Sequence, residues 1–142
     1  MSATGLATFD STVHTTHVWL NEICEEMGWG HDPHRAYTAL RVVLHALRDR
    51  LHPDEAAGFA AQLPLLVRGT FYEGWHPAGK PVRVRTTEEF LAPVAAAFRS
   101  DPVVRASDVA RVVFAVVKRH LSAGEVVDVI AALPADIQTL WA

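Results

Sequence analysis

The chain has 142 residues, of which half are hydrophobic and a fifth are charged, so it can bury one core. Its formal net charge of -3 leaves no basic excess, which argues against a nucleic-acid-binding protein. The single cysteine, Cys24, excludes an internal disulfide. We therefore expect one domain over residues 1–142.

No stretch of the sequence predicts a membrane-spanning helix, because none approaches the roughly 20 apolar residues that such a helix needs. The longest apolar run covers residues 112–117 and is followed at once by two basic residues. The N-terminus also lacks the basic region and apolar run of a signal peptide. We therefore expect a cytoplasmic protein with neither a membrane nor nucleic acid as its partner.

The first half of the chain predicts helices after a short arm. Residues 1–12 are small and polar, and we expect them to form a loose arm. Apolar residues then recur at helical spacing from Thr16 and stop at Gly28, which suits a helix C-terminus. Asp32 followed by Pro33 predicts the start of a second helix. The apolar face of that helix comprises Tyr37, Leu40, Val43, Leu44, Leu47 and Leu51.

Two prolines divide the next stretch into a third and a fourth helix. Pro53 opens the third helix, because the two acidic residues behind it favour the positive end of the helix dipole. Pro64 ends that helix, since proline disfavours the helical conformation in the residue before it. The fourth helix then runs to about Glu73, and residues 76–85 read as a linker loop.

The second half of the chain repeats this plan. Thr86 and Ser122 each stand three residues before a glutamate, which is the capping-box pattern of a helix start. The valine-rich segment after Ser107, the predicted N-cap, suits either a buried strand or a helix. We predict a helix, because the same register in residues 39–51 is helix-forming. Pro134 then precedes a last helix that runs to the C-terminal tryptophan.

The two halves align without a gap at a constant shift of seventy residues, from Arg41/Arg111 to Pro64/Pro134. Identical pairs at this shift are Arg41/Arg111, Val42/Val112, Val43/Val113, Leu51/Leu121, Glu55/Glu125, Ala61/Ala131, Leu63/Leu133 and Pro64/Pro134. We therefore predict an all-α fold: a compact bundle of about eight helices built from two tandem four-helix repeats with pseudo-two-fold symmetry. The repeats comprise residues 13–75 and 86–142.

Three segments of the chain resemble a known family. They are residues 39–51 (ALRVVLHALRDRL), 60–68 (AAQLPLLVR) and 72–81 (YEGWHPAGKP). With them the chain resembles the bacterial domain of unknown function 2267 family over nearly its whole length from about residue 12. The resemblance implies an all-helical, duplicated bacterial domain without an established activity, and it lends no catalytic residue. Phe71 departs from the family, which often carries a second tyrosine there.

An aromatic corner supplies the first candidate site for a ligand or a partner. It comprises Arg68, Phe71, Tyr72, Glu73, Trp75 and His76. In a helix Arg68 shares a face with Phe71 and Tyr72, and aromatic rings beside a guanidinium could bind a planar or anionic ligand. The alternative is that Phe71 and Trp75 pack the seam between the two halves, which Trp141 opposite Phe71 favours.

The histidines supply a second candidate, a metal site. His14 and His17 are three residues apart, and His31 and His34 flank an Asp-Pro pair. Two imidazoles at such spacing can chelate a divalent metal if a nearby carboxylate provides a third ligand. The alternative is exposed histidines without a ligand role, because neither an HExxH nor a CxxC pattern is present. We expect no cofactor.

Two further features predict structural roles. His45 lies in the middle of a predicted helix, where it either donates to a backbone carbonyl or titrates near neutrality beside a carboxylate such as Glu55. The repeated pairs Arg41/Arg111 and Glu55/Glu125 predict an arginine–glutamate tie between two helices of each half. The local sequence pairs no nucleophile with a base, and we expect no catalysis.

We therefore expect a helical module that acts by protein association, either as a homodimer or with a partner helix, and with Trp29 and Trp75 as exposed contact residues. The alternative is a small-ligand or metal-binding protein that uses the aromatic corner or the histidines; an unrecognised enzyme is a third. An association surface predicts a contiguous apolar patch. A ligand site predicts a closed pocket with convergent polar groups, and a metal site predicts three converging ligands.

Overall fold

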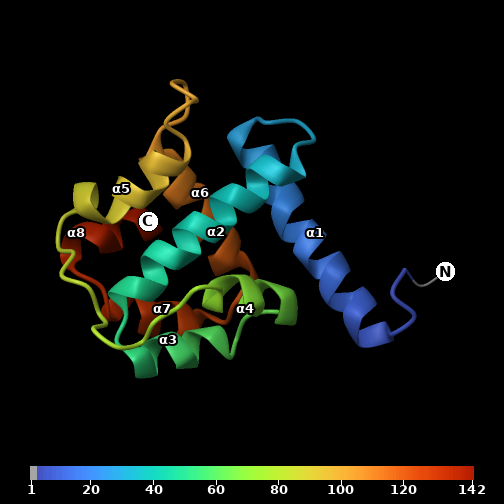
Figure 1. Ribbon diagram of the computed structural model, residues 1–142, viewed down its shortest axis with the longest axis horizontal. Coiled ribbons are helices and arrows are strands. Elements are labelled where there is room, and N and C mark those ends of the chain that lie inside the picture. Colours follow the sequence, from blue (N-terminus) through green and yellow to red (C-terminus); the bar gives the residue numbers. More distant parts are fainter. Residues whose placement is uncertain (1–2) are drawn as a thin grey trace.

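The computed structural model describes residues 3–142, and within that range its regular structure is helical throughout, with no strand (Figure 1). The helices are α1 (Ala7–Met27), α2 (Pro33–Arg50), α3 (Pro53–Ala60), α4 (Leu65–Tyr72), α5 (Thr87–Ala97), α6 (Ala106–His120), α7 (Ala123–Ala131) and α8 (Ala135–Gln138), and a 3-10 turn, η1 (Thr139–Trp141), follows. The predicted all-α bundle of about eight helices is confirmed.

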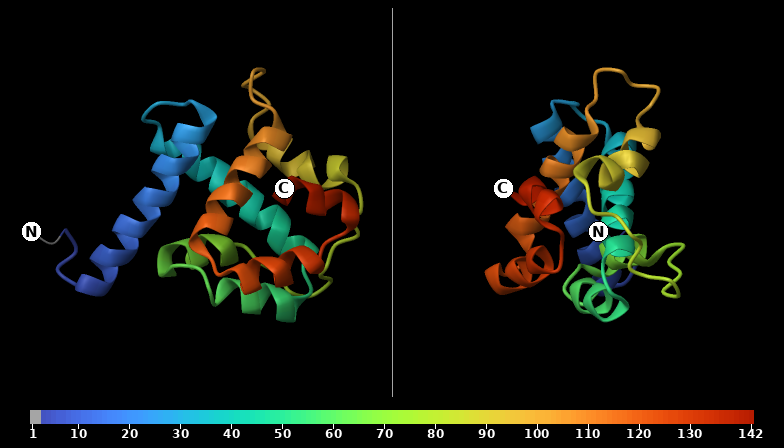
Figure 2. Two further views of the ribbon diagram at one scale, coloured as in Figure 1. Left: turned by 180° about the vertical axis from the view of Figure 1, so that it is seen from behind. Right: turned by 90° about the vertical axis from the view of Figure 1, so that its left-hand side faces the viewer.

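Helix α2 lies at the centre of the bundle and contacts α1, α4, α5 and α6. Helices α3 and α7 lie together at one end, while α5 and α8 meet at the other (Figures 1 and 2). The N-terminal half of α1 extends beyond the other helices (Figure 2). None of the helices within residues 3–142 is long and apolar enough to cross a membrane.

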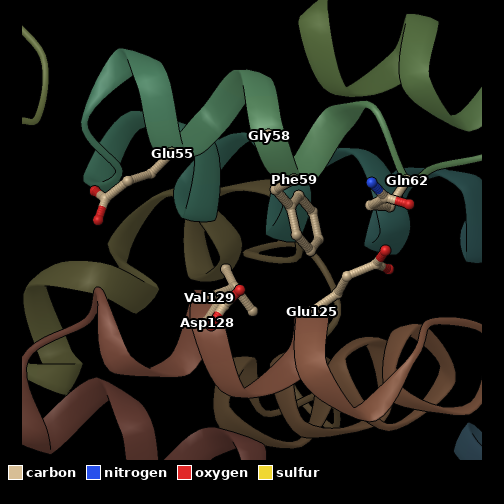
Figure 3. Close-up of a pocket in the computed structure, with 7 residues that line it drawn as sticks. All are labelled: Glu55, Gly58, Phe59, Gln62, Glu125, Asp128 and Val129. Atoms are coloured by element: carbon tan, nitrogen blue, oxygen red, sulfur yellow. The ribbon is translucent and has the colours of Figure 1, made fainter.

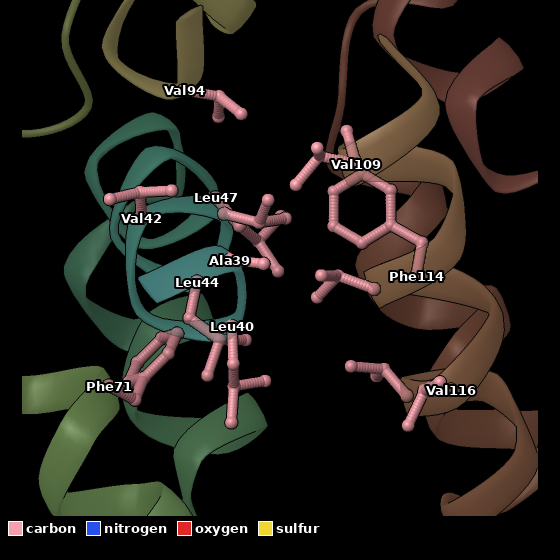
Figure 4. Packing of buried hydrophobic residues seen from close by; sticks show 14 of the residues in the cluster. Ala39, Leu40, Val42, Leu44, Leu47, Phe71, Val94, Val109, Phe114 and Val116 are labelled. Atoms are coloured by element: carbon pink, nitrogen blue, oxygen red, sulfur yellow. The ribbon is translucent and has the colours of Figure 1, made fainter. Parts of the chain in front are cut away.

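The core fills the space between α2 and α6. Leu47 of α2 points toward Phe114 of α6, and Phe71 of α4 closes the same cluster from below (Figure 4). All three side chains are fully buried. Phe114 also stacks on Trp141, with the ring centroids 4.0 Å apart and the planes 10° apart. The C-terminal turn is therefore part of the core rather than a loose end.

Most of the predicted helix ends are confirmed by their caps. Gly28 ends α1 with φ at 71°, a left-handed conformation that a residue without a Cβ adopts readily. The Asp32 side chain accepts a hydrogen bond from the backbone N–H of Arg35 at 3.1 Å. Thr86 and Ser122 do the same for the residues three positions on, at 3.1 and 3.3 Å. These ends could be predicted because each depends on neighbours in the sequence.

Three predicted details are wrong. Helix α1 begins at Ala7 rather than after a loose arm, because the carboxylate of Asp10 accepts hydrogen bonds from the backbone N–H and the hydroxyl of Thr4, at 3.0 and 2.7 Å. Helix α6 begins at Ala106 with Arg105 as its N-cap, before the predicted cap at Ser107. Tyr37, predicted on the apolar face of α2, is exposed, because no neighbouring helix covers that position.

The seventy-residue shift also relates contacts in the structure. Arg48 of α2 donates to the carbonyl of Phe71 at 3.0 Å, and Lys118 of α6 donates to that of Trp141 at 2.6 Å. Arg68 likewise donates to the carbonyl of Leu63, just after α3, at 2.9 Å. Gln138, seventy residues on, donates to the carbonyl of Leu133, just after α7, also at 2.9 Å. These pairs are what two tandem repeats would produce. The duplication, its pseudo-two-fold symmetry and the linker between the repeats stay predictions.

The predicted arginine–glutamate ties do not form. Glu55 accepts a hydrogen bond from the backbone N–H of His52 at 3.0 Å, as one half of a capping box on α3. Arg111 donates to the carbonyl of Thr139 at 3.0 Å and so contacts η1 rather than α7. Glu55 thus serves the start of α3 and Arg111 contacts η1, which a pairing rule based on charge alone does not reveal.

Glu55→Ala should lower the free energy of unfolding by about 1 kcal/mol, because the substitution removes one half of the α3 capping box. Urea denaturation measures the change. Asp54→Ala is the matched control, since it removes a carboxylate from the same turn and leaves the Glu55 cap in place. Equal losses in the two variants would show that charge at the helix end, rather than the cap, is the cause.

Candidate functional site

The aromatic corner forms a ring-to-ring chain at the end of α4. The ring centroids of Phe71 and Tyr72 are 5.5 Å apart, and those of Tyr72 and Trp75 are 5.3 Å apart. Phe71 is fully buried, while Tyr72 and Trp75 are half-buried and pack against the core. Glu73 and His76 are exposed at the rim. Much of this corner therefore packs the interior of the protein.

Arg68 is held away from these rings by backbone carbonyls. Its Nε donates to Ala60 at 3.0 Å, and one terminal nitrogen donates to Leu63 at 2.9 Å. The guanidinium thus binds carbonyls at and just beyond the end of α3, where the helix itself offers few donors. Binding of a ligand by Arg68 together with Tyr72 and Trp75 stays a prediction, and it would have to compete with these bonds.

The predicted metal residues lie on the surface. His14 and His17 are exposed on α1, and His31 and His34 are exposed at the connection to α2. Among residues 3–142, no three or more His, Cys, Asp or Glu side chains come together in a way that could hold a metal ion. The two histidine pairs therefore gain no third ligand from this structure.

His45 is half-buried on α2, and its Nε2 lies 2.7 Å from the carbonyl oxygen of Thr70. A carbonyl only accepts, so Nε2 carries the proton. Desolvation lowers the pKa of His45 from its ordinary value, and the positive charges of Arg48 and Arg41 lower it further, although the bond to Thr70 opposes them. The folded protein therefore favours the neutral form of His45 more than the unfolded chain does.

His45→Gln should make the stability of the fold less dependent on pH below about 6.5. Because the pKa is lower in the folded state, the unfolded chain binds the proton more readily. The stability that neutral His45 contributes is therefore complete above the unfolded pKa and is lost as pH falls through it. Urea unfolding between pH 5 and 8 measures the difference, and parallel curves for parent and variant would contradict it.

A polar cluster joins α1 to α6. His120 stacks on the buried ring of Trp19, with centroids 5.1 Å apart, and its Nε2 lies 2.6 Å from a carboxylate oxygen of Glu22. Arg119 pairs with the same carboxylate at 3.5 Å and with Glu26 at 3.1 Å. These residues are nearly a hundred positions apart, so no local pattern in the sequence indicates them. The cluster holds α1 against the bundle.

Helices α3 and α7 enclose a pocket of about 330 Å³ (Figure 3). Glu55, Glu125 and Asp128 supply carboxylates to its wall, and Phe59 points from α3 toward α7 as an apolar floor. The chemistry of this lining suits a cation with an apolar stem. The repeat alignment pairs Glu55 with Glu125, and the structure adds that both residues line the same pocket.

A second concave surface lies between α1 and α4, and it is almost entirely apolar. The groove holds about 350 Å³ and is lined by Thr4, Phe9, Thr12, Val13, Leu65, Leu66 and Gly69. Three large side chains in its lining are about half exposed: Phe9 at 48%, Leu65 at 48% and Leu66 at 46%. Leu6, whose carbonyl accepts a hydrogen bond from Thr4 of the lining, is 50% exposed. We call these four residues and the groove the α1–α4 patch. Sequence reasoning missed it because residues 1–12 read as a loose arm.

The family model of an uncharacterised conserved protein, DUF2267, matches residues 16–140. This chain belongs to the DUF2267 family. The comparison with curated proteins found no match. The family confirms the resemblance that the sequence suggests and supplies no activity to compare with the site.

In this DUF2267 protein the match covers only part of the α1–α4 patch. Leu65 and Leu66 lie within the matched residues, whereas Leu6 and Phe9 precede them. The family match therefore does not bear on the α1 side of the patch.

Proposed function

We propose that this DUF2267 protein is a helical module that acts by associating with protein through the α1–α4 patch, without catalysis. The observation that carries the proposal is the exposure of Leu6, Phe9, Leu65 and Leu66 around one apolar groove. Burying such side chains removes apolar surface from water, which is the main driving force of protein association. A contiguous apolar patch is the feature that an association role requires.

The patch is also fixed in shape before any partner arrives. The backbone N–H of Leu66, at the start of α4, donates to the hydroxyl of Thr12 on α1 at 3.0 Å. This bond joins the two walls of the groove, and it serves a helix start whose N-cap residue, Pro64, offers no side-chain acceptor. A preformed groove loses little conformational entropy on binding, which favours affinity.

The aromatic residues expected at the interface have less support. Trp29 stacks on Phe98 with the ring centroids 5.8 Å apart, and Trp75 packs against Tyr72. The alternative of a small-ligand protein based on the Arg68 corner is weaker, because the Arg68 guanidinium already donates to backbone carbonyls and the Trp75 ring already packs against Tyr72. We expect the association to occur in the cytoplasm, where the buried free thiol of Cys24 stays reduced.

Photo-crosslinking in the cell tests the proposal. A benzophenone side chain is placed at Leu66, in the patch, and in a matched variant at Val127, which is 63% exposed on α7 and lies outside the patch. We expect a protein adduct at position 66 and not at 127, with the crosslinked peptide identified by mass spectrometry. No adduct at 66, or equal adducts at both positions, would contradict the proposal.

A further inference from the structure

We infer that the partner of the α1–α4 patch is a second copy of this chain, related to the first by a two-fold axis. The inference rests on the proposed association through this patch and adds the identity of the partner. In the dimer, the first turn of α1 of each copy fills the α1–α4 groove of the other. An apolar ridge from each protomer is then covered by an apolar groove from its partner.

The patch holds both halves of such a contact. The ridge is formed by Leu6, the N-cap of α1, and by Phe9 in its first turn. The N-terminal half of α1 extends beyond the other helices (Figures 1 and 2). The groove shares Phe9 with this ridge and lies between α1 and α4. A two-fold interface uses the same surface on both protomers, so it requires a ridge and a hollow within one patch. The α1–α4 patch meets this requirement.

The charge distribution at this surface does not oppose a second copy. Each chain carries a formal net charge of -3, so two copies repel one another over most approaches. A charged group near a two-fold axis would face the same charge on the partner and be repelled. The residues that line the groove are uncharged, so no such repulsion arises there. Asp10, in the same region of α1, accepts two hydrogen bonds from Thr4 of its own chain. The patch is thus a surface where two copies can meet without like charges opposing.

The area of the patch predicts a weak dimer. Four large apolar side chains that are about half exposed offer on the order of 400 Å² per protomer. A stable standard interface buries about 800 Å² per partner, and specific interfaces start near about 1,000 Å² in total. Two such patches together bury about 800 Å², which is below this limit and in the range of weak, transient interfaces. The dimer should therefore dissociate in the micromolar range of concentration rather than persist at nanomolar concentration.

Gly69 provides a test that leaves the fold intact. It lies within α4 and lines the groove, and a Cβ added there would meet no atom within 4 Å. Gly69→Glu therefore places a carboxylate in the groove without disturbing the packing of the protomer. Gly124→Glu is the matched control, since Gly124 lies in α7, away from the patch, and has equally open surroundings. Equal melting temperatures would show that both variants remain folded.

Sedimentation velocity of the untagged chain across the micromolar range measures the dimer. We expect the average mass to rise from 15.6 kDa toward twice that value with concentration for the parent and Gly124→Glu, and to stay at 15.6 kDa for Gly69→Glu. A parent that remains monomeric throughout, or a Gly69→Glu variant that dimerises like the parent, would overturn the inference. If the parent is monomeric but crosslinks at position 66 to a different protein, the homodimer is refuted and the association proposal stands. If the parent is monomeric and gives no adduct at position 66, both are refuted.

Discussion

Arg48→Ala should lower the free energy of unfolding by about 3 kcal/mol. The Arg48 side chain is 5% exposed and donates to the carbonyls of Phe71 and Glu73, at 3.0 and 2.7 Å, while its Nε pairs with Asp49 at 2.9 Å. Removing it leaves two carbonyls at the end of α4 without a charged donor and one carboxylate without its counter-ion. Urea unfolding followed by circular dichroism measures the loss.

Arg48→Lys tests how much of this loss comes from the charge and how much from the number of hydrogen-bond donors. Lys118, seventy residues on, donates to the carbonyl of Trp141 at 2.6 Å, so a lysine can make one such contact from this position of the helix. We expect the lysine variant to lose roughly half as much free energy as the alanine variant, because it keeps the charge and one donor. Arg83→Ala, in the exposed linker, should change the stability little. An Arg48→Ala variant as stable as Arg83→Ala would contradict the assignment.

Phe114→Ala should cost about 3–5 kcal/mol of unfolding free energy, the largest effect that we predict. Phe114 is fully buried, it stacks on Trp141, and its ring lies 6.2 Å from that of Phe90. Truncation opens a cavity between α2, α6 and the C-terminal turn (Figure 4). Chemical denaturation measures the loss at a concentration low enough for the protein to be monomeric.

Phe9→Ala is the matched phenylalanine outside the core. Phe9 is 48% exposed, so its truncation should change the stability of the monomer by less than about 1 kcal/mol. Phe9→Ala should also weaken the dimer, because Phe9 belongs to the α1–α4 patch. Phe114→Ala, where it remains folded, leaves the patch unchanged and should dimerise like the parent. The two phenylalanines thus separate folding from association. Similar stability losses in both variants would show that Phe9 is part of the core and would contradict the assignment of the patch.

The sequence predicts most of the helices because their signals are local. Gly28, Asp32, Thr86 and Ser122 end or begin helices through contacts with residues a few positions away. Periodic apolar residues between these positions set the buried faces. The choice of a helix over a strand for the valine-rich α6 is likewise confirmed, and it depended on comparing one half of the chain with the other.

The sequence does not predict contacts between distant segments, and the candidate site depends on them. His120 meets Glu22 from α6 to α1, and Trp29 is covered by Phe98 and by the guanidinium of Arg35, 4.4 Å from its ring centroid. Periodicity shows that a side chain is apolar without showing which element covers it. For this reason Trp29 read as exposed, while the start of α1, which forms one wall of the patch, read as a loose arm.

Native mass spectrometry of the chain, purified without a His-tag and without added metal, tests the central claim most directly. One spectrum reports both the oligomeric state and any bound adduct. Association through the α1–α4 patch predicts a dimer at twice 15.6 kDa, without an adduct, whose share grows with protein concentration. A monomer at every concentration that carries a stoichiometric extra mass would contradict the claim and would support a ligand-binding function instead.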